Sequence, residues 1–246
     1  MDPFTHDDLR DLLSDRGGPR VSFLMRTTRG GQNQDRTDWK SHLQRAEERL
    51  RAQGERGPDV RNLLGPARDL LDDAQFWLNV SNGLAGFMAP GFFRTYRVPL
   101  ALPEMVVIGS QFYLKPLVPL LKPRESPDQM AGLYRQLHGT GRTANDVREI
   151  VPAAHGGHIE YLFADGRREQ WGRFDPVTGH VDVHEREEPD DEELLNLAVV
   201  FTLAHGGTAY VVDAAEMPDA APLAAIYRLP IGDRSDAHAL PGAMRI

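Results

Sequence analysis

The sequence predicts an α/β protein of the mixed α+β kind, in which a β-sheet domain with packed helices precedes an α/β/α sandwich. Short apolar runs of strand length alternate with longer stretches whose apolar residues recur at helical spacing. The 246 residues, 41% of them hydrophobic and 26% charged, suit one large globular domain or two ordinary ones. The net charge is +1 through Leu121 (16 basic against 15 acidic residues) and −9 from Lys122 onward (12 against 21). This change places a boundary near residue 121.

The first 121 residues are predicted to form the sheet domain. Phe4, Leu9 and Leu12 give a short first helix an apolar stripe, and Gly17-Gly18-Pro19 ends it. Residues 21–25, VSFLM, are typical of a buried strand. The remaining predicted elements are a helix from Asp35 that ends at Gly54, a helix over 59–76, a hairpin of strands 83–89 and 92–98, a strand over 105–108 and a short helix over 112–121.

The second half begins after a predicted linker. Residues 122–129, KPRESPDQ, have the prolines and polarity of a linker and coincide with the charge change. Residues 130–230 are expected to form the sandwich, because strands alternate with helices, and 231–246 are expected to be a disordered tail. The predicted elements are helices over 130–137, 145–151 and 192–204, and strands over 158–163, 169–173, 180–184, 208–212 and 224–228.

Composition excludes several classes of chemistry. With no cysteine, the chain has no disulfides, thiolate zinc sites, iron–sulfur clusters or cysteine nucleophiles. No run approaches the roughly 18 apolar residues of a membrane span, and the start MDPFTHDDLRDLL lacks the basic and apolar regions of a signal peptide. We therefore expect a cytoplasmic protein. A net charge of −8 argues against a protein that coats nucleic acid without specificity.

Several long motifs resemble one protein family. The first half contains LLGPARDLLDDAQFW, GLAGFMAPGFFRTYRVPL and VVIGSQFYLKPLVPLL, at 63–77, 83–100 and 106–121. The second half contains GTGRTANDVREIVPAA, QWGRFDPVTGHVDVHE, DEELLNLAVVFTLAHGGTAYVV and EMPDAAPLAAIYR, at 139–154, 170–185, 191–212 and 216–228. Together these segments resemble the N- and C-terminal domains of the bacterial proteins related to archaeal and eukaryotic class-one release factors and Pelota. The resemblance covers nearly everything from Phe4 to Arg228.

One departure from the family is large. Family members typically have three domains, and the central one carries the Gly-Gly-Gln loop of true release factors. Here only the predicted linker separates the FYLKPL-like helix from the GTGR-like segment. The resemblance therefore implies the two outer domains joined directly, a first that inspects the decoding site and a second that binds partners. The sequence has no Asn-Ile-Lys-Ser-like codon-reading motif, so we do not expect stop-codon recognition.

The tripeptide Gly30-Gly31-Gln32 admits two interpretations. A catalytic glutamine must sit at an extended tip that reaches the peptidyl-transferase centre. Alternatively, the glycines give a strand-to-helix loop its permissive backbone, and Asp35 or Thr37 caps the helix. We favour the loop, because the tripeptide lies in the N-terminal domain and a three-residue motif often occurs by chance. No other catalytic motif is present, so we predict no enzyme, no catalytic residues and no cofactor.

Two charged sets are candidate binding surfaces. The basic set could contact ribosomal or transfer RNA and comprises Arg29, Arg36, Lys40, Arg45, Arg49, Arg56 and Arg61. Because Glu47, Glu48, Glu55 and Asp59 interleave with it, the alternative is a solvated face with i,i+4 ion pairs. The acidic set could bind a basic partner and comprises Glu187, Glu188, Asp190 and Asp191. Its alternative is a loop leading into a helix N-terminus, where carboxylates suit the dipole.

Four histidines are weak candidates for a zinc or nickel site: His155, His158, His180 and His184. The glycines of HGGH, residues 155–158, favour a turn, and ligands at opposite strand ends need not converge. We interpret these residues as turn or surface histidines and predict no bound metal.

The leading functional hypothesis is a non-catalytic protein that associates with the ribosome or a translation factor, in rescue, stalling or hibernation-type regulation. It would occupy a site without performing chemistry there. The alternative is a protein–protein interaction module, a homodimer for instance, that no longer acts on the ribosome.

Overall fold

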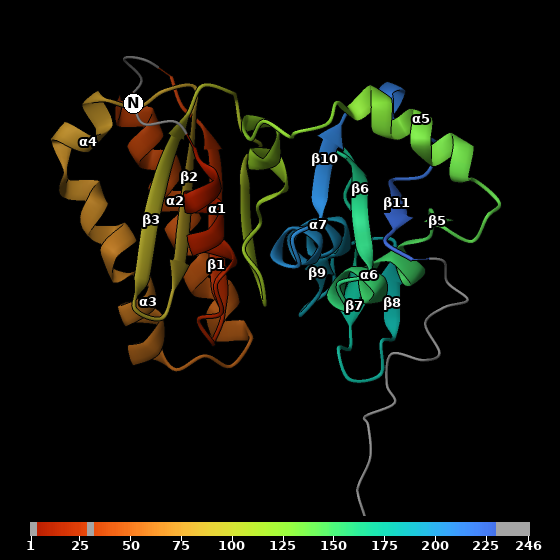
Figure 1. Cartoon of the computed structure of the whole chain (residues 1–246). Coiled ribbons are helices and arrows are strands. Elements are labelled where there is room, and N and C mark those ends of the chain that lie inside the picture. The colour runs from red at the N-terminus through yellow and green to blue at the C-terminus, as the bar shows by residue number, and fades with distance from the viewer. Residues whose placement is uncertain (1–3, 29–31, 230–246) are drawn as a thin grey trace, which may run out of the picture.

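The computed structural model describes residues 4–28 and 32–229, which form two halves side by side, each built on a β-sheet (Figure 1). The fold is mixed α+β, as the sequence predicts. None of the helices within this part of the chain is long and apolar enough to cross a membrane. The predicted disordered tail, 231–246, lies outside the described residues.

The first half contains an antiparallel sheet with the strand order β3-β2-β1-β4. Its strands are β1 (Arg20–Arg26), β2 (Gly83–Ala89), β3 (Phe92–Val98) and β4 (Met105–Gly109). β1 is central and carries buried side chains on both faces, which explains its run of apolar residues. The hairpin of β2 and β3 is confirmed, and Gly91 takes a positive φ of 70° in its turn.

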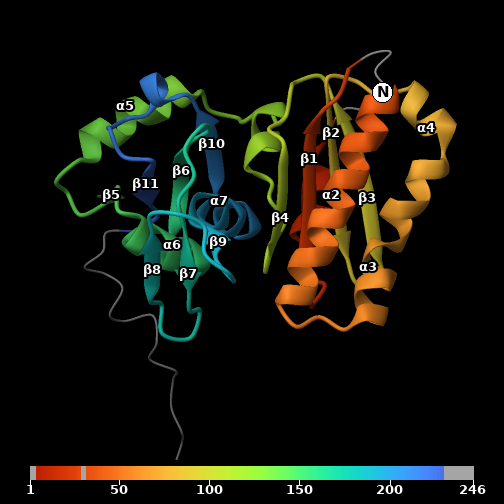
Figure 2. The same ribbon diagram turned by 180° about the vertical axis from the view of Figure 1, so that it is seen from behind.

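Helices cover one face of this sheet (Figure 2). They are α2 (Gln32–Ala52), α3 (Gly57–Asp69), η1 (Leu70–Asp72) and α4 (Ala74–Leu78). Trp39 of α2 is fully buried and donates a hydrogen bond from Nε1 to the Ala67 carbonyl oxygen at 2.8 Å, which joins α2 to α3. The single helix predicted over 59–76 is wrong. The chain breaks at Asp73, whose carboxylate accepts a hydrogen bond from Phe76 N and so caps the new helix α4.

The opposite face of the first sheet packs against α1 (His6–Leu13) and η2 (Lys115–Leu120). Thr5 and Asp8 form a capping box that begins α1. The short helix predicted over 112–121 is a 3₁₀ helix from Lys115 to Leu120. Pro119 lies inside it and has no N–H group to donate to a carbonyl one turn back, which disfavours an α-helix.

The second half is an α/β/α sandwich, as predicted. Its main sheet has the order β10-β6-β11-β5, with β10 and β6 parallel and the other neighbours antiparallel. These strands are β5 (Thr143–Ala144), β6 (Ile159–Asp165), β10 (Thr208–Val212) and β11 (Leu223–Tyr227). One face packs against α5 (Pro127–Leu137) and the other against α6 (Val147–His155) and α7 (Leu194–Ala204).

A smaller sheet lies beside the sandwich, with the order β8-β7-β9. Its strands are β7 (Trp171–Phe174), β8 (Val181–His184) and β9 (Glu192–Glu193). The helix predicted over 192–204 begins at Leu194, because Glu192 and Glu193 pair with β7 instead. The Glu193 carboxylate accepts hydrogen bonds from Leu195 N and Asn196 N and so caps α7. A short helix η3 (Ala214–Glu216) follows β10.

The linker is shorter than predicted, because α5 begins at Pro127 instead of at Met130. Ser126 and Gln129 form a capping box, and Pro127 takes the first helical position, where its missing N–H costs nothing. The polar and proline residues that resemble a linker are thus the start signal of a helix. Residues 121–126 connect η2 to α5.

Asn196 of α7 joins the two halves through three buried hydrogen bonds. Its Oδ1 accepts from Leu114 N at 2.8 Å and Lys115 N at 3.0 Å, and its Nδ2 donates to the Phe112 carbonyl oxygen at 2.9 Å. Beside it, the buried Lys115 places Nζ 3.4 Å from Glu193 Oε2. These contacts hold α7 and the small sheet against the first half.

Candidate functional site

The predicted basic set does not form one face. An α-helix turns about 100° per residue, so Arg36 and Lys40 lie together on one flank of α2. Arg45 and Arg49, nine residues further along in each case, lie on the opposite flank. The expectation of a single RNA-binding face is therefore wrong for α2, and the two flanks have different surroundings.

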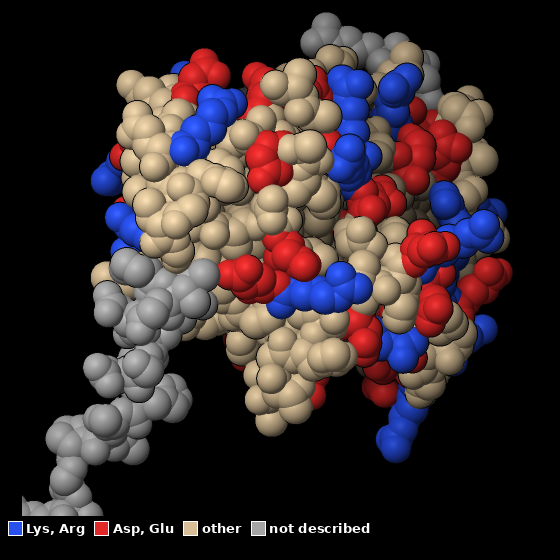
Figure 3. Space-filling view, turned by 90° about the vertical axis from the view of Figure 1, so that its right-hand side faces the viewer, with Lys and Arg blue, Asp and Glu red and all other residues tan. Residues whose placement is uncertain are grey.

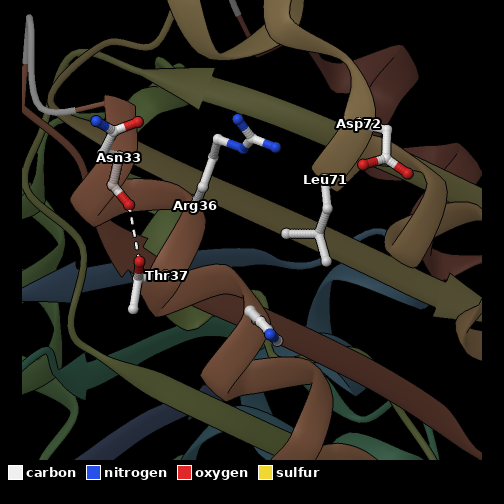
Figure 4. Close-up of a pocket in the computed structure, with 6 residues that line it drawn as sticks. Asn33, Arg36, Thr37, Leu71 and Asp72 are labelled. Carbon is white, nitrogen blue, oxygen red and sulfur yellow. Dashed lines mark hydrogen bonds between the residues drawn. The ribbon is translucent and has the colours of Figure 1, made fainter.

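Arg36 and Lys40 line a shallow depression of about 480 Å³ between α2 and η1. Its other lining residues are Asn33, Thr37, Leu71 and Asp72. In Figure 4 the Arg36 side chain extends towards the side that Leu71 and Asp72 form. Within the described residues, neither Arg36 nor Lys40 forms an ion pair or a side-chain hydrogen bond. Both cations are thus free to meet a ligand from solution.

On the opposite flank the cations serve the fold. Arg45 Nη2 lies 3.1 Å from Nδ1 of the buried His42. Arg49 donates to the Val106 carbonyl oxygen at 2.9 Å and to Glu187 Oε1 at 2.5 Å, which ties α2 to the second half. Arg49 is therefore a contact between the halves, not a free RNA-binding residue.

The remaining basic residues differ again. Arg56 immediately precedes α3 and Arg61 lies on it, and both are exposed without an ion pair in the described part of the chain. Arg29 falls outside the described residues. The interleaved Glu47 pairs with Arg51 and Arg68, so the alternative of a solvated, ion-paired surface holds for this part of α2 and α3.

Two members of the acidic set already have partners within the chain. Asp191 has no exposed side-chain surface, and its Oδ2 accepts from His184 Nδ1 at 2.8 Å and Glu188 N at 3.0 Å. Glu187 is bound to Arg49. Glu187, Glu188 and Asp190 are exposed, and Asp190 takes a positive φ of 68°. Asp191 is therefore inaccessible to a partner and Glu187 is already ion-paired, while docking through the exposed carboxylates stays a prediction.

The four histidines do not gather. The His155 ring packs against the rings of Phe174 and Phe201, and His180 lies 3.0 Å from Asp182. HGGH is a turn between α6 and β6, as predicted, with Gly157 at a φ of 74°. Across residues 4–28 and 32–229, one group of three metal-ligating side chains lies close together: His184, Glu188 and Asp191. The hydrogen bond to Asp191 raises the pKa of His184.

Of the Gly-Gly-Gln tripeptide, Gly30 and Gly31 lie outside the described residues, and Gln32 begins α2. The prediction that Asp35 or Thr37 caps this helix is wrong, because the helix begins before both of them. Asp35 is buried in the first turn, where burial raises its pKa, and it accepts from Thr28 N at 3.4 Å. Thr37 donates to the Asn33 carbonyl oxygen within the helix.

A cleft of about 880 Å³ between the halves was not anticipated. Its basic lining residues include Arg10, Lys122, Arg124 and Arg228, and Tyr161 supplies an aromatic surface. The only sign of this cleft in the sequence is the pair Lys122 and Arg124 in the predicted linker, where charged residues are common in any case. On the face of the molecule that Figure 3 shows, basic and acidic side chains are interspersed.

No family model and no curated protein sequence matches this chain. The functional argument therefore rests on the motifs of the sequence and on the geometry of the surfaces described above.

Proposed function

We propose that this chain is a non-catalytic RNA-contacting protein of the translation machinery, which associates with the ribosome in rescue, stalling or hibernation-type regulation. The observation that carries the proposal is the pair Arg36 and Lys40. They lie one helical turn apart near the start of α2, on the rim of an open depression, and neither has a carboxylate partner among the described residues.

This geometry suits a phosphate backbone. A guanidinium and an ammonium on one flank of a helix match neighbouring phosphates, whose contacts supply much of the affinity of RNA-binding surfaces. The depression between α2 and η1 is shallow, which suits an extended polymer better than an enclosed small molecule.

The position of Gln32 supports a role without catalysis. It begins α2, directly after the short connection from β1, and both elements belong to the packed first half. A release glutamine needs an extended tip that reaches far from the body of the protein. The resemblance of the chain's motifs to the outer domains of release-factor relatives is the reason for proposing that this RNA belongs to the ribosome.

Ribosome sedimentation tests the proposal. The purified chain is mixed with ribosomes and run through a sucrose gradient at low and high salt. We expect co-migration at low salt that falls steeply as salt is added, because phosphate contacts release counterions. The double variant Arg36→Glu, Lys40→Glu should reduce the bound fraction at least tenfold.

The matched control is the double variant Arg135→Glu, Arg148→Glu. These two arginines lie exposed on α5 and α6 of the second half and form no side-chain ion pair with any described residue. The control makes the same charge change and should bind as the wild type does. Absence of wild-type co-migration at low salt would refute the proposal. A dimer that stays at the top of the gradient would favour the rival interaction module.

A further inference from the structure

We propose that His184, Glu188 and Asp191 form a binding site for a divalent transition-metal cation, for which Zn²⁺ is the probe. The three side chains come from the end of β8 and the loop that follows it, at a spacing of H-x₃-E-x₂-D. Each offers one ligand atom, and the three atoms lie within 4.8 Å of one another. The site joins one histidine of the weak metal set to two carboxylates of the acidic set.

The distances fit one ion. Zn²⁺ binds imidazole nitrogen and carboxylate oxygen at about 2.0–2.2 Å, so neighbouring ligand atoms of a tetrahedral site lie roughly 3.4 Å apart. His184 Nδ1 lies 2.8 Å from Asp191 Oδ2 and 3.7 Å from Glu188 Oε2. These separations lie on either side of that value. An ion between the three atoms would take the place of the proton that His184 Nδ1 now shares with Asp191.

A second observation comes from the Asp191 carboxylate. Its side chain has no exposed surface, yet its Oδ1 accepts no hydrogen bond. The partner of Oδ1 is an ion pair, which leaves Oδ2 as the oxygen nearest His184. Arg173 Nε lies 3.3 Å from Oδ1, at the position of an outer partner that orients a ligating carboxylate.

The local charge favours a cation. From Glu185 to Glu193 the chain has seven acidic residues and one arginine, a net charge of −6 over nine residues. Arg173 and Arg49 offset only part of this charge. A bound dication would reduce the repulsion among the remaining carboxylates.

The donor set selects the type of ion. One imidazole nitrogen with two carboxylate oxygens suits Zn²⁺ and its first-row neighbours, whereas Ca²⁺ and Mg²⁺ prefer oxygen ligands alone. The binding loop also reaches the first half, through Glu187 to Arg49 and through Glu192 Oε1, which accepts from Ser110 N at 2.5 Å. A bound ion would therefore also stabilise the contact between the halves.

The test uses the full chain without an affinity tag, treated with EDTA and then dialysed into chelator-free buffer. Calorimetric titration with ZnCl₂ should give one ion per chain, and Co²⁺ should give visible absorption bands that added Zn²⁺ removes. His184→Gln should weaken Zn²⁺ binding at least tenfold. Glu188→Gln should also weaken it, and because the Glu188 side chain is 55% exposed this change leaves the fold intact.

The control is His180→Gln. His180 is an exposed histidine that immediately precedes β8 and lies outside the group, so the variant should bind Zn²⁺ as the wild type does. Binding of less than half an ion per chain by the wild type would overturn the proposal. Equal affinity in the wild type and in folded Glu188→Gln, with Co²⁺ spectra unchanged, would also overturn it. Neither measurement involves ribosomes, so failure here is distinct from failure of the proposed function.

Discussion

His42 is a fully buried ionisable residue between α2 and β1. Its Nδ1 lies 2.9 Å from the Asp38 carbonyl oxygen and its Nε2 lies 3.0 Å from that of Leu24. Burial lowers the pKa of His42, and the nearby Arg45 adds to this effect, whereas the two carbonyl groups and Glu104, 3.7 Å away, oppose it. The neutral ring is therefore the form that the folded protein holds at pH 7.

This lowered pKa predicts a loss of stability in mild acid. As the pH falls below the ordinary histidine pKa of about 6.5, the unfolded chain binds a proton that the folded chain does not. The stability contribution of His42 is therefore present above this pH and decreases below it, by at most about 1.4 kcal/mol per pH unit.

Urea unfolding of the wild type and of His42→Gln between pH 7.5 and 5 measures this contribution. The wild type should lose more stability over this range than the variant, since other titrating groups affect both proteins alike. His180→Gln, which replaces an exposed histidine, serves as a control and should keep the wild-type pH dependence. Identical pH slopes for the wild type and His42→Gln would show that folding does not lower the pKa of His42.

At the scale of elements, one close contact sets the distance between α2 and the sheet. A Cβ atom placed on Gly86 of β2 would come within 2.4 Å of the Trp39 ring, which is fully buried and also touches Phe23 and Trp77 edge to face. The ring cannot move away without displacing α3, to which it is hydrogen-bonded. The glycine therefore sets the spacing between the helix layer and the sheet.

Gly86→Ala should consequently destabilise the protein by about 1–3 kcal/mol, the usual cost of overpacking a core. The control is Gly132→Ala on α5, where a Cβ atom would meet nothing within 4 Å. It should be neutral or stabilising by up to about 1 kcal/mol, because alanine favours the helix. Equilibrium unfolding in urea compares the two, and an unchanged midpoint for Gly86→Ala would contradict the role given to this glycine.

The elements also show what the sequence could reveal. The β2–β3 hairpin and the long apolar α7 were predictable, because a tight turn and an apolar run are local signals. The break at Asp73 and the early start of α5 were missed, because a capping side chain uses the same polar residues as a linker or a helix surface. These errors concern where elements begin and end, and only short elements such as β5 and β9 were missed entirely.

The candidate sites were harder to predict because they depend on contacts between distant segments. The sequence gives no indication that Arg49 binds Glu187, which lies 138 residues away. This ion pair engages both side chains within the chain. The positions of the arginines around α2, in contrast, could be predicted from the sequence. Nine residues separate Arg36 from Arg45, which places them on opposite flanks of the helix. The group of His184, Glu188 and Asp191 was also accessible from spacing, once the histidines and the acidic segment were considered together.

At the scale of the whole molecule, a buried polar layer joins the halves. Burial raises the pKa of Glu193, and Lys115 together with three backbone N–H groups favours its charged form. The Lys115 ammonium donates to the Arg168 carbonyl oxygen at 2.5 Å, so the pair spans the junction. Such a layer orients the halves specifically, since each polar group must find its partner again whenever the halves separate.

Asn196 is the centre of this layer, and Asn196→Ala tests it. The change leaves the buried N–H groups of Leu114 and Lys115 and the Phe112 carbonyl group without their partner, at a cost of about 1–3 kcal/mol for each buried group. We expect a loss of several kcal/mol, with the single calorimetric transition of the wild type splitting into two as the halves uncouple. Trypsin should also cleave faster after Arg124 in the exposed connection.

Asn62→Ala is the matched control, because Asn62 lies exposed on α3 and its side chain bonds to no described residue. It should change stability by less than about 0.5 kcal/mol and leave one transition. If Asn196→Ala also kept a single transition and wild-type protease resistance, apolar packing of Val200 against the first half would be sufficient to hold the junction. The two outcomes therefore decide whether hydrogen bonds or apolar contacts set the relative position of the halves.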